Sequence, residues 1–162
     1  MTTVGFLHLK NVPGFDEDEH FAKVQEFHAI PESEKHHLKW HHHNRDNPNY
    51  YRGLAPFVNN DPSHKELFDM GGSIALVSEE EKQYPLVEET PFPLGQEYAH
   101  LKPHYEKMYN LFHGLGLQLI RYLALGLGKP RDFFDKWFEK DSLSTMRSIY
   151  YKPRSESSVK SD

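Results

Sequence analysis

The sequence contains no cysteine among its 162 residues. This excludes disulfides, thiol catalysis and metal centres with cysteine ligands. A chain without cysteine suits a reducing compartment, so we expect a cytoplasmic protein. No apolar run approaches the roughly 18 residues that a membrane span needs, and the first residues lack the basic segment of a signal peptide. We therefore expect neither a membrane helix nor a leader.

The sequence also lacks a basic stripe. Its 19 Lys and Arg residues are outnumbered by 24 Asp and Glu, and the net charge is −5. Because both signs are spread along the chain, nucleic acid is a poor candidate partner. Aromatic residues, in contrast, make up 14% of the chain. They predict a core or cleft lined by rings, within a chain long enough to build one core.

Five of the twelve histidines gather in one segment, residues 34–43, with the sequence EKHHLKWHHH. On a helix His37 and His41 would share a face, at a spacing where two imidazoles can chelate a transition metal. No third ligand converges on them, however, and the neighbouring lysine and arginine charges would repel a dication. We favour a solvated helix end, and we keep a histidine-rich metal-binding module as an alternative hypothesis.

Hydrophobic periodicity predicts both strands and helices in the first third of the chain. The alternation in residues 4–12 predicts a strand that stops at a Pro-Gly turn. Residues 16–30 predict a helix, which Asp16 and Glu19 open in the pattern of a capping box. Residues 31–40 predict a second, short helix. From residue 44 to residue 93 the apolar pieces are short, and we expect an irregular region.

The strongest periodic signal predicts a long helix over residues 98–122, with apolar side chains at alternating steps of three and four. Pro103 must lie in its first turn or kink it, and the glycines at 126 and 128 end it. A coiled coil is the alternative, but Gly114 and Gly116 interrupt the pattern, so we favour a buried helix packed on a sheet.

A short aromatic helix over residues 130–140 and a strand over residues 143–151 follow the long helix. The alternation places Arg147, Ile149 and Tyr151 on one face of this strand. Because the two predicted strands lie some 130 residues apart with helices between them, we expect an α+β chain whose sheet is incomplete.

Six segments occur in an order and spacing that together resemble a known family. They are VGFLHLKNV, FHAIPESEK, YYRGLAPF, HKELFDMG, LALGLGKPRDFF and LSTMRSIYYKP. The series resembles the N-terminal part of the isopenicillin N synthase-like 2-oxoglutarate/Fe(II)-dependent dioxygenases over about residues 4–153. The resemblance implies the helical and strand region that precedes a double-stranded β-helix, or jelly roll. Residues 1–140 would be the N-terminal domain without its first strand and helix, and residues 141–162 the start of a truncated oxygenase domain.

The resemblance also implies an oxidoreductase that uses Fe(II) and 2-oxoglutarate on a small organic molecule. In the family a His-x-Asp pair and a distant His hold iron, and an Arg-x-Ser holds 2-oxoglutarate, all beyond the equivalent of Tyr151. No His-x-Asp or Arg-x-Ser occurs here. His64 with Glu66 and His104 with Glu106 are the only His-x-Glu substitutes, and neither is a favourable site. We therefore expect no catalytic or metal-binding residue in this chain. By itself the chain should be inactive and should bind neither Fe(II) nor 2-oxoglutarate tightly.

The resemblance suggests four ligand-binding residues. Tyr151 matches a tyrosine that often hydrogen-bonds 2-oxoglutarate, although Ile149 replaces the asparagine that often stands two positions earlier. Arg147 is a candidate for an anionic substrate, with a solvated sheet arginine as the equal alternative. Tyr51 and Arg52 match positions where some members bind substrate, but loop structure beside a glycine is the favoured interpretation there.

A different class of function is kept open. The chain would be a non-catalytic short paralogue that acts as an interaction protein. It would associate through the exposed long helix or the unfinished sheet, because an apolar stripe without its own sheet needs a partner.

Overall fold

The computed structural model describes residues 5–58, 61–138 and 143–153. The described residues contain four α-helices and three strands. They are α1 (Glu17–Ala29), α2 (Glu32–Lys35), β1 (Gly53–Ala55), β2 (Lys65–Met70), α3 (Leu101–Gly126), α4 (Asp135–Phe138) and β3 (Met146–Tyr151). Short 3-10 turns lie at His36–Leu38, Ile74–Leu76, Glu81–Gln83 and Gln96–Tyr98.

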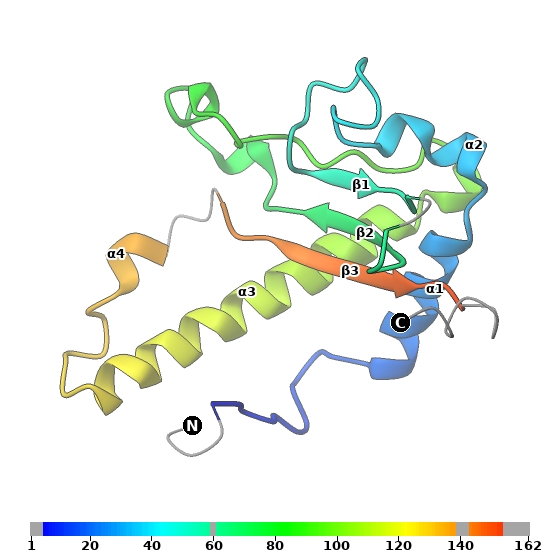
Figure 1. The fold of residues 1–162 in the computed structure, drawn as a ribbon. Helices are drawn as coiled ribbons and strands as arrows, with labels where there is room; N and C mark the ends of the chain where they lie inside the picture. The colour runs from blue at the N-terminus through cyan, green and yellow to red at the C-terminus, as the bar shows by residue number, and fades with distance from the viewer. Residues whose placement is uncertain (1–4, 59–60, 139–142, 154–162) are drawn as a thin grey trace.

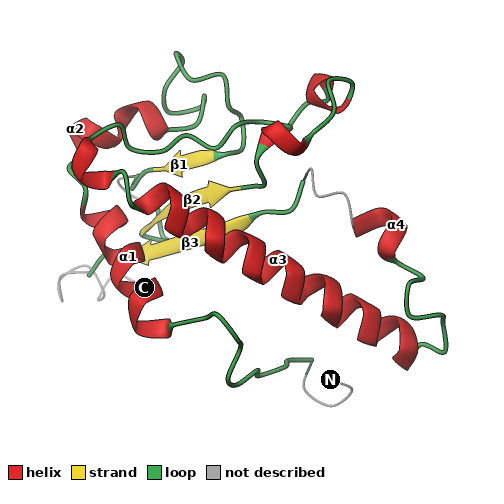
Figure 2. Cartoon of the chain, turned by 180° about the vertical axis from the view of Figure 1, so that it is seen from behind, coloured by secondary structure: helices red, strands yellow, loops and turns green. Residues whose placement is uncertain are grey.

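The three strands form one antiparallel sheet in the order β1-β2-β3. Helix α3 lies behind the sheet in Figure 1 and in front of it in Figure 2, where the molecule is seen from the other side. Helix α1 lies on the same side, and in the described part of the chain no helix covers the opposite face. The expected α+β class with an incomplete sheet is confirmed.

The core lies between the sheet and the helices α1 and α3. The ring of Phe68 of β2 packs at a tilt against that of Phe27 of α1, with centroids 4.3 Å apart, and the ring of Tyr105 of α3 lies 5.6 Å from Phe27 and 5.7 Å from Phe68. The buried core cluster is Phe27, Ile30, Leu38, Leu54, Phe68, Met70, Leu101, Tyr105 and Tyr109. Burial of these large apolar side chains is what holds the helices on the sheet.

Helix α1 begins as the sequence predicts, and α3 begins at Leu101 rather than at residue 98. The Asp16 carboxylate accepts a hydrogen bond of 2.9 Å from the backbone N–H of Glu19, which caps α1. Pro103 lies in the first turn of α3, where its missing N–H costs no helical hydrogen bond. The first half of α3 packs on the sheet, but Tyr122, Leu123 and others of its second half are 48 to 62% exposed. The predicted burial therefore holds for the first half only.

The predicted strand over residues 4–12 is wrong for its described part. Residues 5–12 form no strand, and the side chain of Phe6 is 84% exposed. A strand needs a neighbour for its backbone N–H and C=O groups, and no described strand lies beside this segment. Alternation by itself therefore did not make a strand here.

The expectation of an irregular region from 44 to 93 is wrong at two places, since β1 and the central strand β2 lie inside it. Strand β2 was missed because Glu66 and Asp69 interrupt its apolar pattern. Both are nevertheless buried, at 1% and 0% exposure. Partners from distant parts of the chain neutralise them, which is what lets charged residues occupy a central strand.

Candidate functional site

The uncovered face of the sheet carries the residues that the sequence singled out on β3. Because side chains alternate along a strand, Arg147, Ile149 and Tyr151 point away from the helices. Ile149 is 43% exposed and Tyr151 is 63% exposed. The predicted face of β3 is therefore confirmed, and it is open along its length.

Arg147 is anchored on this face by Asp69 of β2. The two residues are direct cross-strand partners. The Nε and Nη2 atoms of Arg147 donate hydrogen bonds of 2.6 and 2.7 Å to the two carboxylate oxygens of Asp69. This hydrogen-bonded contact raises the pKa of Arg147 above its ordinary value. A bidentate pair fixes the plane of the guanidinium, while the side chain stays 47% exposed.

Tyr51 reaches the beginning of β3 from the loop before β1. Its hydroxyl donates to the carbonyl oxygen of Leu143 at 3.1 Å and contacts the hydroxyl of Thr145. Burial raises the pKa of Tyr51, and the nearby carboxylates of Asp69 and Glu88 act in the same direction. Tyr51 and Arg147 therefore belong to one polar group around Asp69.

Arg52 is directed into the protein rather than onto the open face. Its side chain is 1% exposed, and its Nη1 donates to the carbonyl oxygens of Gly72, at 2.9 Å, and Glu88. Gly71 leaves room for the guanidinium, because a Cβ there would lie 2.1 Å from Arg52 Cζ. The structure thus separates Arg52 from Tyr51, although they are adjacent in sequence.

Glu88 fixes the loop that carries these two residues. Its carboxylate accepts hydrogen bonds from the backbone N–H groups of Tyr50, Tyr51 and Arg52 at 2.7, 3.1 and 2.8 Å. Three successive N–H groups around one carboxylate form a nest. Sequence reasoning missed Glu88, because nothing in its own neighbourhood points to a loop 36 to 38 residues away.

Tyr151 lies at the other end of β3, opposite Lys65 of β2. It shares the open face with Arg147, four residues earlier, but it is not part of the group around Asp69. Of the four residues suggested by the sequence, the structure therefore brings together Tyr51 and Arg147, places Tyr151 further along the same face, and turns Arg52 inward.

The His-x-Glu pairs do not offer iron ligands. Glu66 is buried and accepts hydrogen bonds from His28 at 2.7 Å and Lys35 at 2.9 and 3.1 Å. Glu106 pairs weakly with Lys102 at 3.9 Å, whereas His104, two residues earlier on α3, is buried against another helix. Within the described residues no group of three or more His, Cys, Asp or Glu side chains could hold a metal ion. These residues do not fit an iron centre.

The histidine-rich segment is not a continuous helix. Helix α2 ends at Lys35, a 3-10 turn covers His36–Leu38, and Lys39 is already extended. His37 and His41 therefore do not share a helix face, and their rings serve the loops instead. The Nε2 of His37 donates to the Phe92 carbonyl at 3.2 Å, and the Nδ1 of His41 donates to the Asn47 carbonyl at 2.8 Å.

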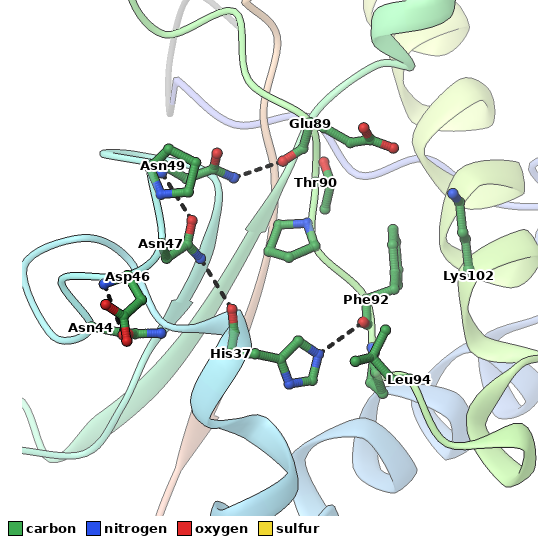
Figure 3. Close-up of a pocket in the computed structure, with 13 residues that line it drawn as sticks. His37, Asn44, Asp46, Asn47, Asn49, Glu89, Thr90, Phe92, Leu94 and Lys102 are labelled. Carbon is green, nitrogen blue, oxygen red and sulfur yellow. Dashed lines mark hydrogen bonds between the residues drawn. The ribbon is translucent and has the colours of Figure 1, made fainter.

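His37 lines a surface pocket of about 590 Å³ between the histidine-rich segment and residues 89–94 (Figure 3). Asn47 donates to the His37 carbonyl at 3.1 Å, and Asn49 donates to the Glu89 carbonyl at 2.6 Å. Asn49 therefore ties the two walls of the pocket together, whereas Asn47 holds its own loop on His37.

Known proteins resemble this chain in sequence and in fold. Isopenicillin N synthase from Streptomyces clavuligerus is 33% identical over 156 residues, which cover 91% of this chain and 45% of that protein. The enzyme of the same name from Streptomyces jumonjinensis is 28% identical over 79% of this chain and 40% of its own length. A 2OG-Fe(II) oxygenase family protein from Caulobacter crescentus superimposes with a TM-score of 0.67 at 22% identity, covering 87% of this chain and 45% of that one.

The chain is similar to isopenicillin N synthases over most of its length, and it shares its fold with a 2OG-Fe(II) oxygenase family protein. A C-terminally truncated protein from Neurospora crassa, in its apo form, shares this fold with a TM-score of 0.64, 23% identity and coverage of 88% and 48% of the two chains. No model of a protein family matches the sequence. The chain spans less than half the length of the curated relatives that it matches.

Two further predictions from the sequence concern membrane helices and the domain boundary. Among the helices that the structure describes, none is long and apolar enough to cross a membrane. The predicted boundary between residues 1–140 and residues 141–162 falls in the segment 139–142, outside the described residues. Strand β3, which follows that boundary, pairs with β2, which precedes it.

Proposed function

We propose that this chain forms the N-terminal region of an oxidoreductase that activates dioxygen with Fe(II) and 2-oxoglutarate. The observation that carries the proposal is the 33% identity to an isopenicillin N synthase along 91% of the chain. The fold shared with 2OG-Fe(II) oxygenases supports it. Residues 1–140 would act as the N-terminal domain and residues 141–162 as the beginning of the oxygenase domain.

A small organic molecule is the proposed substrate class. The full-length form of the Neurospora crassa protein, which shares the fold of this chain, has been crystallised with alpha-KG and thymine and with alpha-KG and 5-formyluracil. The residues that contact the substrate determine which small molecule is bound. A cytoplasmic location and the absence of a nucleic-acid partner remain predictions from cysteine content and charge.

We assign ligand roles on the open face of the sheet. Tyr151 would donate a hydrogen bond to a carboxylate of 2-oxoglutarate, and its 63% exposure leaves the hydroxyl accessible. Arg147 would hold an anionic group of the substrate, because Asp69 uses only the Nε and Nη2 side of the guanidinium, and Tyr51 would line the same substrate site. Arg52 would contribute indirectly, by supporting the loop that carries Tyr51.

The 162-residue chain by itself would not turn over 2-oxoglutarate, since its described residues offer no set of iron ligands. The test is release of succinate from 2-oxoglutarate by the purified chain with Fe(II). We expect no steady turnover, and steady turnover would refute the claim of inactivity. A chimera, in which this chain replaces the equivalent region of the full-length Neurospora crassa protein, should turn over 2-oxoglutarate; a folded but inactive chimera contradicts the proposed role.

Within an active chimera, Tyr151→Phe tests the cofactor role. Loss of one hydrogen bond to a charged group is worth about 1.5 kcal/mol, so the KM for 2-oxoglutarate should rise roughly tenfold. Tyr150→Phe, on the neighbouring residue of the same strand, is the matched control and should leave this KM unchanged. Equal effects of the two variants would remove Tyr151 from the site.

A non-catalytic interaction protein is the second candidate function. The observation that favours it is the exposed apolar surface on the second half of α3 and on α4, where Leu125 and Trp137 are 51% and 56% exposed. Light scattering of the purified chain, alone and with a full-length family member, tests it. A monomer that binds no such chain counts against this candidate.

A further inference from the structure

A pair of histidines joins the two helices that carry the core, away from the open face of the sheet. His20 of α1 and His104 of α3 lie with Nδ1 and Nε2 3.3 Å apart, and their rings stack at a centroid distance of 5.5 Å. His104 is 8% exposed. The ring of Phe112 packs against His20 with centroids 5.9 Å apart, and His20 itself is partly buried.

The hydrogen bond between these nitrogens needs one proton and one lone pair. Two neutral imidazoles satisfy it, because the N–H of one ring faces the bare nitrogen of the other. One additional proton can bind to the outer nitrogen of the donor ring, and it leaves this hydrogen bond intact. When both rings are fully protonated, two N–H groups face each other, the hydrogen bond is lost and two positive charges stand in contact. The geometry therefore tolerates one extra proton and not two.

The charged groups around the pair do not compensate for a second proton. Helix α1 contributes the Glu19 carboxylate, 3.9 Å from Nδ1 of His104, and the ammonium of Lys23. The α3 side contributes the positive charge of Lys107, and His100 just before that helix adds a third imidazole ring. One carboxylate that is half-exposed thus faces two lysines and a third histidine.

The pKa values of the pair follow from this environment. Burial lowers the pKa of His20, and the charge of His104 lowers it further. Burial also lowers the pKa of His104; Glu19 opposes this change, and Lys107, Lys23 and His100 reinforce it. Both rings therefore prefer their neutral forms in the folded protein more than in the unfolded chain.

We propose that His20 and His104 form an acid-sensitive clip, which holds the first turns of α1 on α3 until both rings are protonated. The second half of α1 stays anchored by Phe27 in the core. Release of the clip therefore loosens residues 17–23 locally rather than unfolding the chain. The sign follows from linkage: a lowered folded pKa gives stability that is complete above the ordinary histidine value of about 6.5 and is lost as the pH falls through the folded values.

Hydrogen exchange on the full chain tests the clip, read as protection factors for residues 17–23 at about pH 7.5 and about pH 5, on either side of the ordinary histidine pKa. We expect protection in the wild type to fall severalfold at the lower pH. His104→Gln keeps a hydrogen-bonding side chain that does not titrate, so its protection should be independent of pH. His100→Gln removes a more exposed histidine of the same helix seam and should behave like the wild type.

Two outcomes overturn the proposal. One is constant protection of the wild type across this pH range, and the other is a pH-dependent loss in His104→Gln equal to that of the wild type. If His104→Gln does not fold, NMR titration of the imidazoles in the wild type decides. A pKa at or above about 6.5 for both rings then refutes the clip. Because the readout is local to residues 17–23, it is separate from the His28–Glu66 contact near the other end of α1.

Discussion

Asp69 and Arg147 face each other across the β2–β3 pair, joined by two hydrogen bonds of 2.6 and 2.7 Å. The two partners differ in environment, since Asp69 is fully buried whereas the Arg147 side chain is 47% exposed. Removal of one partner therefore leaves either a buried charge or a charge that can reach water. The pair fastens the last described strand to the sheet and fixes its register.

Substitution of the two residues should give unequal losses of stability. Arg147→Met leaves the Asp69 carboxylate buried and unpaired, so the free energy of unfolding should fall by about 3 kcal/mol or more. Asp69→Asn keeps a hydrogen-bond acceptor and leaves an arginine that water can solvate, so the loss should be about 1–2 kcal/mol. Urea unfolding of both variants measures the difference. Equal losses, or a larger loss in Asp69→Asn, would contradict the asymmetry.

Replacement of glycines should stabilise or destabilise according to their position. Gly53 has a φ of 128°, and a Cβ there would lie 2.4 Å from the carbonyl oxygen of Leu38. Gly53→Ala should therefore cost about 2 kcal/mol or more. Gly114, inside α3, has no atom within 4 Å of such a Cβ. Gly114→Ala should raise the free energy of unfolding by about 0.5–1 kcal/mol. Thermal unfolding of this matched pair should show opposite shifts in Tm.

The buried Glu66 should make stability depend on acid pH. Burial favours its neutral form, but hydrogen bonds from His28 and Lys35 outweigh burial and hold the pKa of Glu66 below its ordinary value. Its contribution is therefore complete above about pH 4.3, the ordinary value, and is lost as the pH falls through the folded value. Glu66→Gln should lose about 3 kcal/mol at neutral pH and should show a shallower loss of stability in acid than the wild type.

Glu26→Gln is the control for this effect. Glu26 also has a lowered pKa, caused first by its hydrogen bond from Lys23 and then by that from His100, but its side chain is 37% exposed. Solvent screening should limit its loss to about 1 kcal/mol or less. Urea unfolding of the two variants and the wild type at several pH values separates the contributions. A larger effect for Glu26 than for Glu66 would be inconsistent with the buried network.

The two faces of the sheet should respond differently to truncation. Phe68 is fully buried against Phe27 and Tyr105, so Phe68→Ala should cost about 3–5 kcal/mol. Ile149 lies on the open face at 43% exposure, and Ile149→Ala should cost about 1 kcal/mol or less. Denaturation of both variants in dilute solution provides the comparison. A loss in Ile149→Ala close to that of Phe68→Ala would show that the open face is covered.

The candidate site was only partly predictable from the sequence. The alternation of residues 143–151 placed Arg147 and Tyr151 on one face of a strand, and the structure has them there. Their surroundings were not predictable, because Asp69 lies 78 residues before Arg147 and Glu88 lies 37 residues after Tyr51. A side chain shows its own chemistry in the sequence, whereas its partner is chosen by strand pairing and loop packing.

The sequence by itself determined the elements whose stabilising contacts are local. The cap at Asp16, the proline in the first turn of α3 and the glycine near its end act within a few residues, as helical hydrogen bonds do. The tertiary structure alone decided the sheet. It made a central strand of the charged segment Lys65–Met70 and left the alternating residues 5–12 outside the sheet. A strand is stabilised by neighbours that are distant in the chain, and only folding determines which neighbours it receives.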